Sequence, residues 1–121
     1  MFGLGRRRPD RIDATEALRR TSETQDAILL DVREPDEWYA GHAPNATLVP
    51  LSSFDPQGPL PYVSGDRPVV LICRSGHRSQ QAAAFYTERG VDAVDVTGGM
   101  IAWAGAGHPV VDEQGNPGSI I

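Results

Sequence analysis

The 121-residue chain contains one cysteine and no lysine, and both scarcities limit its chemistry. A lone cysteine cannot form a disulfide within the chain, and it cannot supply a cysteine cluster for a metal. Without lysine there is no Schiff-base nucleophile and no phosphate-binding lysine of the P-loop kind. Any cysteine chemistry within the chain therefore uses a single thiol.

Long apolar runs are also missing, because no segment approaches the roughly 18 uninterrupted apolar residues that cross a bilayer. Residues 1–8 include three arginines, but no apolar run and no small-residue cleavage site follows them, so they do not resemble a signal peptide. We therefore expect a soluble, cytoplasmic protein without a membrane span.

The charge is unevenly distributed along the chain. The net charge is -5, yet four of the eleven arginines lie in the first eleven residues, which leaves 7 basic and 15 acidic side chains from residue 12 onward. We expect no nucleic-acid binding by so acidic a body. The length suits one domain, and we interpret 1–10 as a basic flexible tail, 11–108 as the domain and 109–121 as a C-terminal tail.

Two short apolar runs, 27–32 and 69–73, are typical of strands buried on both faces of a parallel sheet. Weaker strand candidates lie at 47–49 and 91–96. Helix signals separate these segments and begin near residues 13, 35 and, most clearly, 78. The alternation predicts a single α/β domain with a mainly parallel central sheet and helices on both faces. A proline-rich stretch, 54–68, is interpreted as a connector.

Cys73 stands where the second predicted strand ends, just before the clearest predicted helix. Ligand sites of parallel α/β sheets lie at the carboxyl ends of strands, where helix N-termini present unpaired N–H groups. We expect the N–H groups of residues 75–78 to converge on the sulfur, and Arg74 and Arg78 to add positive charge. Gly76 suits a loop conformation that side chains resist. Cys73 is therefore predicted to be a nucleophilic thiolate at neutral pH; the alternative is a small buried core residue.

Three motifs, in order, resemble those of the rhodanese family. They are residues 30–38 (LDVREPDEW) with 41–46 (GHAPNA), the loop 73–79 (CRSGHRS), and Gly98-Gly99 followed by Trp103. The resemblance spans about residues 11 to 108. It implies a single-domain rhodanese-like fold, in agreement with the α/β pattern above.

The resemblance also implies a thiosulfate sulfurtransferase-like enzyme. Catalytic Cys73 would take sulfane sulfur from a small anionic donor such as thiosulfate, hold it as a covalent persulfide, and pass it to cyanide, a thiol or a protein acceptor. No metal or organic cofactor is implied. The residues implied to form the substrate-binding loop are Arg74, Ser75, Gly76, His77, Arg78 and Ser79. Ser79 has helix capping as an alternative role, and His77 either tunes acceptor choice or is merely exposed.

Asp31 and Arg33 end the first predicted strand and should lie at the same sheet edge as Cys73. The resemblance implies that Asp31 helps to hold the loop and that Arg33 joins a surface or substrate-facing ion pair. The alternative for Arg33 is a structural ion pair with Glu34, Glu37 or another acid.

Two other kinds of function compete with sulfur transfer. Phosphatases that share the rhodanese fold have five residues between the loop cysteine and the closing arginine, whereas four lie between Cys73 and Arg78, which favours a single sulfur atom over a tetrahedral oxyanion. An arsenate reductase would need an external thiol, because the chain has no second cysteine. The rival from another class is a non-catalytic module that binds a partner and reports sulfur or redox state through Cys73.

Overall fold

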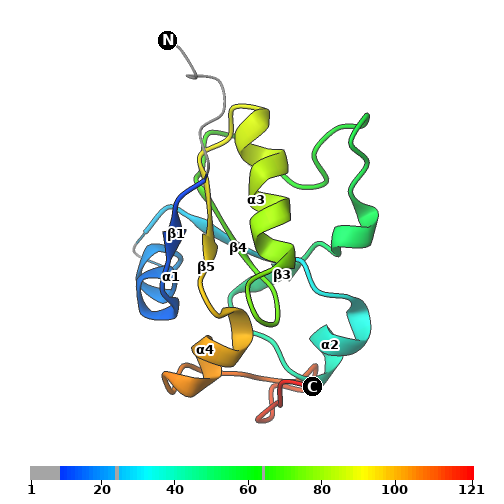
Figure 1. The fold of residues 1–121 in the computed structure, drawn as a ribbon. Helices are drawn as coiled ribbons and strands as arrows, with labels where there is room; N and C mark the ends of the chain where they lie inside the picture. The colour runs from blue at the N-terminus through cyan, green and yellow to red at the C-terminus, as the bar shows by residue number, and fades with distance from the viewer. Residues whose placement is uncertain (1–8, 24, 64) are drawn as a thin grey trace.

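The computed structural model describes residues 9–23, 25–63 and 65–121 (Figure 1). Most of the predicted basic tail, residues 1–8, lies outside this range. Five parallel strands form one sheet in the order β1-β5-β4-β2-β3. The strands are β1 (Arg11–Ile12), β2 (Ile28–Asp31), β3 (Ala46–Leu48), β4 (Val69–Ile72) and β5 (Ala93–Val96). The helices are α1 (Ala14–Arg20), α2 (Pro35–Ala40), the 3-10 helix η2 (Leu51–Ser53), α3 (Arg78–Glu88) and α4 (Gly99–Gly105).

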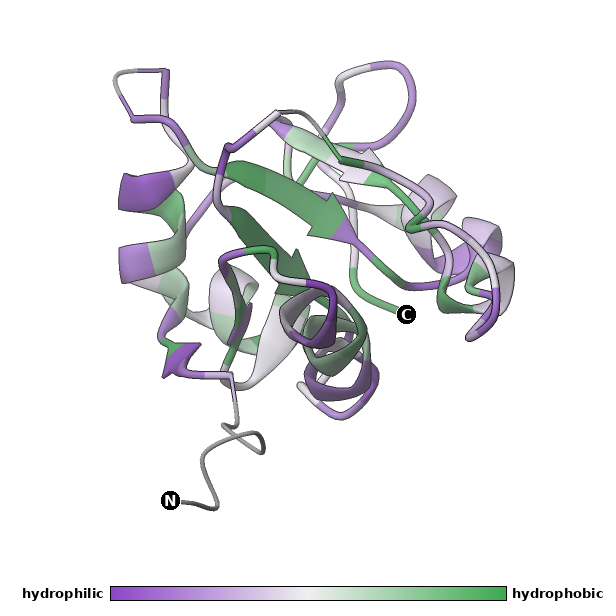
Figure 2. Ribbon diagram, turned by 90° about the horizontal axis from the view of Figure 1, so that it is seen from above, coloured by the Kyte–Doolittle hydropathy of each residue, from purple (hydrophilic) through white to green (hydrophobic). Residues whose placement is uncertain are grey.

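Strand β4 forms the centre of the sheet, and all four of its residues are buried. Val70 and Ile72 face the core beneath α1 and α4, whereas Val69 and Leu71 face the core beneath α3. Both faces are therefore apolar, which explains the unalternating run in the sequence. Figure 2 shows the strands mainly in the hydrophobic colour, with hydrophilic segments on the helices. The predicted parallel sheet with helices on both faces is confirmed.

Helix α3 directly follows the loop that contains Cys73, and it packs on one face of the sheet. Ala82, Ala83 and Tyr86 recur at helical spacing and pack onto the sheet. The helix begins at Arg78, as predicted, and its C-terminal end is followed by Gly90 with φ +84, a left-handed conformation that suits glycine.

Two elements had no clear signal in the sequence. Strand β1 has only two residues, too few for any periodicity, and it forms because it pairs with β5. Helix α4 begins at Gly99, and glycine is a poor helix former, so the helix is held by burial of Met100 and Trp103. The connector 54–68 packs through Phe54 against Tyr86 of α3.

The segment 109–121 lies against α2 rather than extending away from the domain. Val111 forms isolated bridges with His42 and with Pro117, and the Ser119 N–H donates to the Ala40 carbonyl at 2.9 Å. The end of this segment reaches the loop that contains Cys73, because the Ile121 carbonyl accepts a hydrogen bond from Arg74 Nε at 2.8 Å. Within the described residues, no helix is long and apolar enough to cross a membrane.

Candidate active site

Cys73 follows the last residue of β4 and is 1% exposed. The loop 74–77 leads directly into α3, so the sulfur sits between a strand end and a helix N-terminus. Because β2 and β4 are paired in parallel, with Asp31 beside Ile72, the end of β2 lies at the same sheet edge as Cys73. From the sequence, Asp31 and Cys73 were expected to share one edge of the sheet, and the two strand ends do lie side by side.

The Cys73 sulfur accepts two backbone hydrogen bonds. The Gly76 N–H lies 3.1 Å from Sγ and the Ser79 N–H lies 3.3 Å from it. Among the described residues, Ser75, His77 and Arg78 make no N–H hydrogen bond to the sulfur, so only Gly76 of the four amides predicted to converge does so. Ser79, the second residue of α3, contributes the second amide because the helix begins immediately beside the sulfur.

The loop conformation depends on glycines at two places in the chain. Gly76 has φ +105, and a Cβ there would lie 2.8 Å from Arg11 Nη2. Gly99 has φ +56 and lies so close beneath the loop that a Cβ would collide with the carbonyl oxygen of Cys73. This close approach lets the Met100 N–H donate to that carbonyl at 2.8 Å, and the Ile101 N–H donate to the Arg74 carbonyl at 3.1 Å. These two hydrogen bonds hold the loop against the N-terminus of α4.

Both loop arginines are already engaged. Arg78 donates from Nη1 and Nη2 to the two carboxylate oxygens of Glu37, at 2.7 and 2.8 Å. The hydrogen-bonded guanidinium lowers the pKa of Glu37 to about 2, and the same contact raises the pKa of Arg78. Arg74 is exposed and donates from Nε to the Ile121 carbonyl at 2.8 Å. The Arg78–Glu37 pair is partly buried, so a ligand that binds the Arg78 guanidinium has to compete with the Glu37 carboxylate.

Arg33 is wholly buried, which differs from the surface or substrate-facing ion pair that the resemblance implied. It donates from Nη2 to Asp31 at 2.7 Å and from Nε to the same carboxylate at 3.0 Å. Nη2 also donates to the Gly41 carbonyl at 2.8 Å, which ties the end of β2 to the end of α2. The alternative of a structural ion pair matches this geometry, with Asp31 as the partner instead of Glu34 or Glu37. The hydrogen bonds of the Asp31 carboxylate go to Arg33 rather than to the loop.

Two acidic side chains beside the site have roles that the sequence did not indicate, because Glu37 was considered only as a partner of Arg33 and Asp95 was not considered. Glu37 belongs to the motif at 30–38, but its pairing with Arg78 joins residues 41 positions apart. Asp95 is 1% exposed and accepts a hydrogen bond from the Ser79 hydroxyl at 2.7 Å. An acid inside the predicted strand 91–96 was the available signal, because charged residues are almost never fully buried without a partner.

The remaining loop residues face outward. Ser75 and His77 are exposed. In the part of the chain that the structure describes, no group of three or more His, Cys, Asp or Glu side chains is placed to hold a metal ion. The arrangement is that of a buried thiol that accepts two backbone N–H groups, with the guanidinium groups of Arg78 and Arg11 interacting electrostatically with it.

Known proteins resemble this chain both in sequence and in fold. Residues 13–106 match the profile of the family described as Rhodanese-like domain. A protein named sulfurtransferase from Allochromatium vinosum is 37% identical over 105 residues, which cover 86% of this chain and 96% of that protein. The thiosulfate sulfurtransferase GlpE of Pseudoalteromonas translucida is 31% identical over 85 residues, 69% of this chain and 79% of that protein. The crystal structure of a rhodanese-related protein from Thermoplasma volcanium matches with a TM-score of 0.74 at 32% identity, covering 86% of this chain and 99% of that chain.

Proposed function

Because the chain belongs to the rhodanese-like domain family, as its motifs predicted, we propose that it is a sulfurtransferase that carries sulfane sulfur as a persulfide on Cys73. The observation that carries this proposal is the sulfur at the centre of the loop, bound by the Gly76 and Ser79 amides. Relatives named sulfurtransferase support the reaction class. Thiosulfate as donor, and cyanide or a thiol as acceptor, belong to the proposal.

In the first step, the Cys73 thiolate attacks the outer sulfur of thiosulfate. A bond forms between Sγ and that sulfur, the sulfur–sulfur bond of thiosulfate breaks, and sulfite leaves with the electron pair. No outside oxidant or reductant is needed, because the donor sulfur is already at the oxidation level of a persulfide. The protein's contribution is to hold the thiolate in place and to stabilise the negative charge that moves onto the terminal sulfur.

The loop offers donors for that terminal sulfur. Within the described residues, the N–H groups of Ser75, His77 and Arg78 have no hydrogen-bond acceptor, so they remain available to an anion. Preorganised amides at a helix N-terminus favour negative charge without moving during the reaction. Arg78 adds a full positive charge that interacts electrostatically with Cys73, although the Arg78 guanidinium is also paired with Glu37.

In the second step, a thiophilic acceptor attacks the terminal sulfur and the Cys73 thiolate leaves. With cyanide the product is thiocyanate, and with a thiol it is a new persulfide. Ser75 and His77 are exposed, so their side chains are among those of the loop that an acceptor arriving from solvent would meet. The loop therefore needs no second cysteine to complete the cycle.

The test is to incubate the purified protein with thiosulfate or polysulfide and to measure its intact mass. We expect a gain of one sulfur atom that cyanide removes and that Cys73→Ser abolishes. The matched control is Ser75→Ala, which leaves the sulfur and both of its amide donors in place and should still gain one sulfur. An unchanged mass with both donors would refute the proposal and favour a module that does not carry sulfur.

A further inference from the structure

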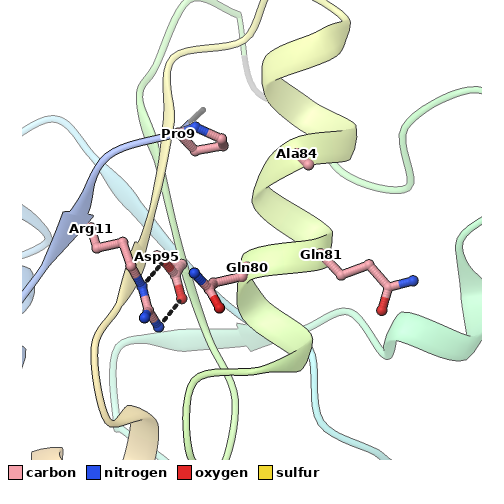
Figure 3. Close-up of a pocket in the computed structure, with 6 residues that line it drawn as sticks. All are labelled: Pro9, Arg11, Gln80, Gln81, Ala84 and Asp95. Carbon is pink, nitrogen blue, oxygen red and sulfur yellow. Dashed lines mark hydrogen bonds and ion pairs between the residues drawn. The ribbon is translucent and has the colours of Figure 1, made fainter. Parts of the chain in front are cut away.

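Asp95 is a buried carboxylate in the middle of a strand, and its partners connect it to the nucleophile. In the sheet it stands directly beside Arg11 of β1, and the Arg11 guanidinium donates to both of its oxygens, from Nε to Oδ1 at 2.9 Å and from Nη2 to Oδ2 at 3.1 Å (Figure 3). The side chain of Asp95 is 1% exposed and that of Arg11 is 34% exposed. On its other side, Asp95 accepts a hydrogen bond from the Ser79 hydroxyl at 2.7 Å.

The Ser79 hydroxyl has one proton and two possible acceptors. Its oxygen lies 2.7 Å from Asp95 Oδ2 and 3.4 Å from the Cys73 sulfur. An ionised carboxylate only accepts hydrogen bonds, so the Ser79 proton points to Asp95 and the hydroxyl oxygen turns its lone pairs to the sulfur. In that orientation the hydroxyl accepts from a Cys73 thiol but has no proton to offer a sulfur anion.

Arg11 allows this orientation to change. If the Ser79 proton turns to the sulfur, Asp95 Oδ2 still accepts from Arg11 Nη2, so no buried carboxylate oxygen is left without a donor. The contact with Asp95 raises the pKa of Arg11, which keeps the guanidinium charged. Arg11 also donates to the Gly76 carbonyl at 2.9 Å, so the pair is tied to the active loop itself.

We propose that Asp95 is a positioning residue that sets the direction of the Ser79 hydroxyl and thereby the reactivity of Cys73. The Ser79 proton binds Asp95 while the sulfur is a thiol, and it turns to the sulfur when Cys73 becomes a thiolate or a persulfide anion. Arg11 holds the carboxylate through both states. The inference rests on the proposed function, since it assigns the control of the same nucleophile.

Charged groups on three other elements, α3, β1 and β2, lie near the sulfur or at the same edge of the sheet. Arg78 of α3 and Arg11 of β1 both interact electrostatically with Cys73. Asp31 of β2 lies at the same edge, but its carboxylate is paired with Arg33. A test must therefore separate the hydroxyl effect from a simple change in charge.

A surface cavity of about 550 Å³ adjoins the Arg11–Asp95 pair, between β1, β5 and α3. Figure 3 shows Gln80 extending from α3 towards the pair, whereas Gln81 extends away from it. The cavity leaves Arg11 partly in contact with solvent, so the pair can be altered by substitution without opening the apolar core beneath α3.

The experiment measures the rate at which iodoacetamide alkylates Cys73 as a function of pH. In Asp95→Asn, the Ser79 hydroxyl loses its charged acceptor and keeps at most a neutral amide oxygen, which is a weaker acceptor. Its proton then turns to the sulfur more readily, so we expect the pH of half-maximal rate to fall by about one unit. The same substitution in a Ser79→Ala background should cause less than half of that fall, because the hydroxyl is gone. Equal falls in the two backgrounds, or no fall, would overturn the proposal.

Two further variants keep the test decisive. Asp92→Asn removes an exposed acid just before β5 and should leave the pH profile unchanged; a fall equal to that of Asp95→Asn would overturn the proposal. If Asp95→Asn does not fold, Arg11→Gln/Asp95→Asn replaces the ion pair by an amide pair without changing the net charge, and a fall in the pH of half-maximal rate is still expected. Alkylation needs no sulfur donor, so these outcomes do not depend on whether Cys73 accepts sulfur from thiosulfate.

Discussion

The guanidinium of Arg78 and the carboxylate of Glu37 form a two-point ion pair, with N–O distances of 2.7 and 2.8 Å. The pair joins the first residue of α3 to the first turn of α2, so it links the helix that follows the Cys73 loop to the helix that follows β2. An anionic sulfur donor that needs Arg78 must therefore compete with Glu37. Under the proposed function, we therefore expect the pair to affect the affinity for an anionic donor.

Removing the charge of Glu37 should improve the binding of an anionic donor. In Glu37→Gln, Arg78 keeps only a neutral partner, so an anionic donor competes more easily for its guanidinium. We expect the KM for thiosulfate to fall by at most about fivefold, because a partly exposed ion pair is weak, and kcat to change less. Steady-state kinetics with cyanide as acceptor measures both constants. Glu16→Gln is the matched control, since among the described residues Glu16 forms ion pairs only with Arg19 and Arg20 on α1, and the KM of this variant should not change. An unchanged or higher KM in Glu37→Gln would contradict the expectation.

The same pair should make part of the stability depend on acid pH. The pKa of Glu37 is about 2 in the folded chain, below its usual 4.5, so folding favours the ionised form. This contribution is complete above about pH 5 and is lost as the pH falls towards 2. Because the pair is partly exposed to solvent, we expect it to be about 1 kcal/mol. The difference in urea unfolding free energy between wild type and Glu37→Gln should shrink with acidification, and a constant difference would count against the pair.

Gly99 should tolerate no side chain. In Gly99→Ala the methyl group meets the carbonyl of Cys73 and the backbone has φ +56, so we expect a loss of at least about 2 kcal/mol in the free energy of unfolding. Gly105 is the matched control at the other end of α4, because a Cβ there meets nothing within 4 Å. Gly105→Ala should be neutral or stabilising by up to about 1 kcal/mol. Equal effects of the two substitutions in thermal or urea unfolding would show that the Cys73 loop moves to accommodate the methyl group.

The buried Asp31–Arg33 pair should be costly to break on one side only. Arg33→Met leaves the Asp31 carboxylate buried without its main donors, and we expect a loss of about 3–5 kcal/mol. The double variant Asp31→Leu/Arg33→Met removes both charges and should recover most of that loss in urea unfolding. Arg67→Met, which removes an exposed ion pair with Asp26, is expected to cost less than about 1 kcal/mol. A double variant as unstable as the single one would mean that the pair contributes more than its charges.

Much of the fold was predictable because burial leaves a pattern in the sequence. The four buried residues of β4 form an apolar run, and the Ala82, Ala83 and Tyr86 stripe predicts α3. Strand β1 was not predictable, because two residues carry no periodicity and their conformation comes from pairing with β5. Helix α4 was hidden by glycines at both of its ends, and tertiary packing overrides their poor helix propensity.

The candidate site was predictable in its centre and less so in its surroundings. The strand-end position placed Cys73 and Asp31 at one edge, because parallel strands share the direction of their carboxyl ends. The partners of the loop arginines were not predictable, since Arg78 to Glu37 and Arg74 to Ile121 are contacts between distant parts of the chain. From the sequence, Asp95 could be identified only as an acidic residue within a predicted strand. Its hydrogen-bond partner Arg11 could not be predicted, because it depends on the order of the strands in the sheet.

The segment 109–121 ends beside the loop, with the Ile121 carbonyl 2.8 Å from Arg74 Nε. A sulfur-accepting protein joined by a flexible linker behind Ile121 would therefore begin its path at the rim of the Cys73 site. Such a linkage would turn the second half of the reaction into an intramolecular event, at an effective acceptor concentration in the millimolar range for a short linker. Under the proposed function, a fusion at Ile121 would therefore tether a chosen acceptor close to the persulfide on Cys73.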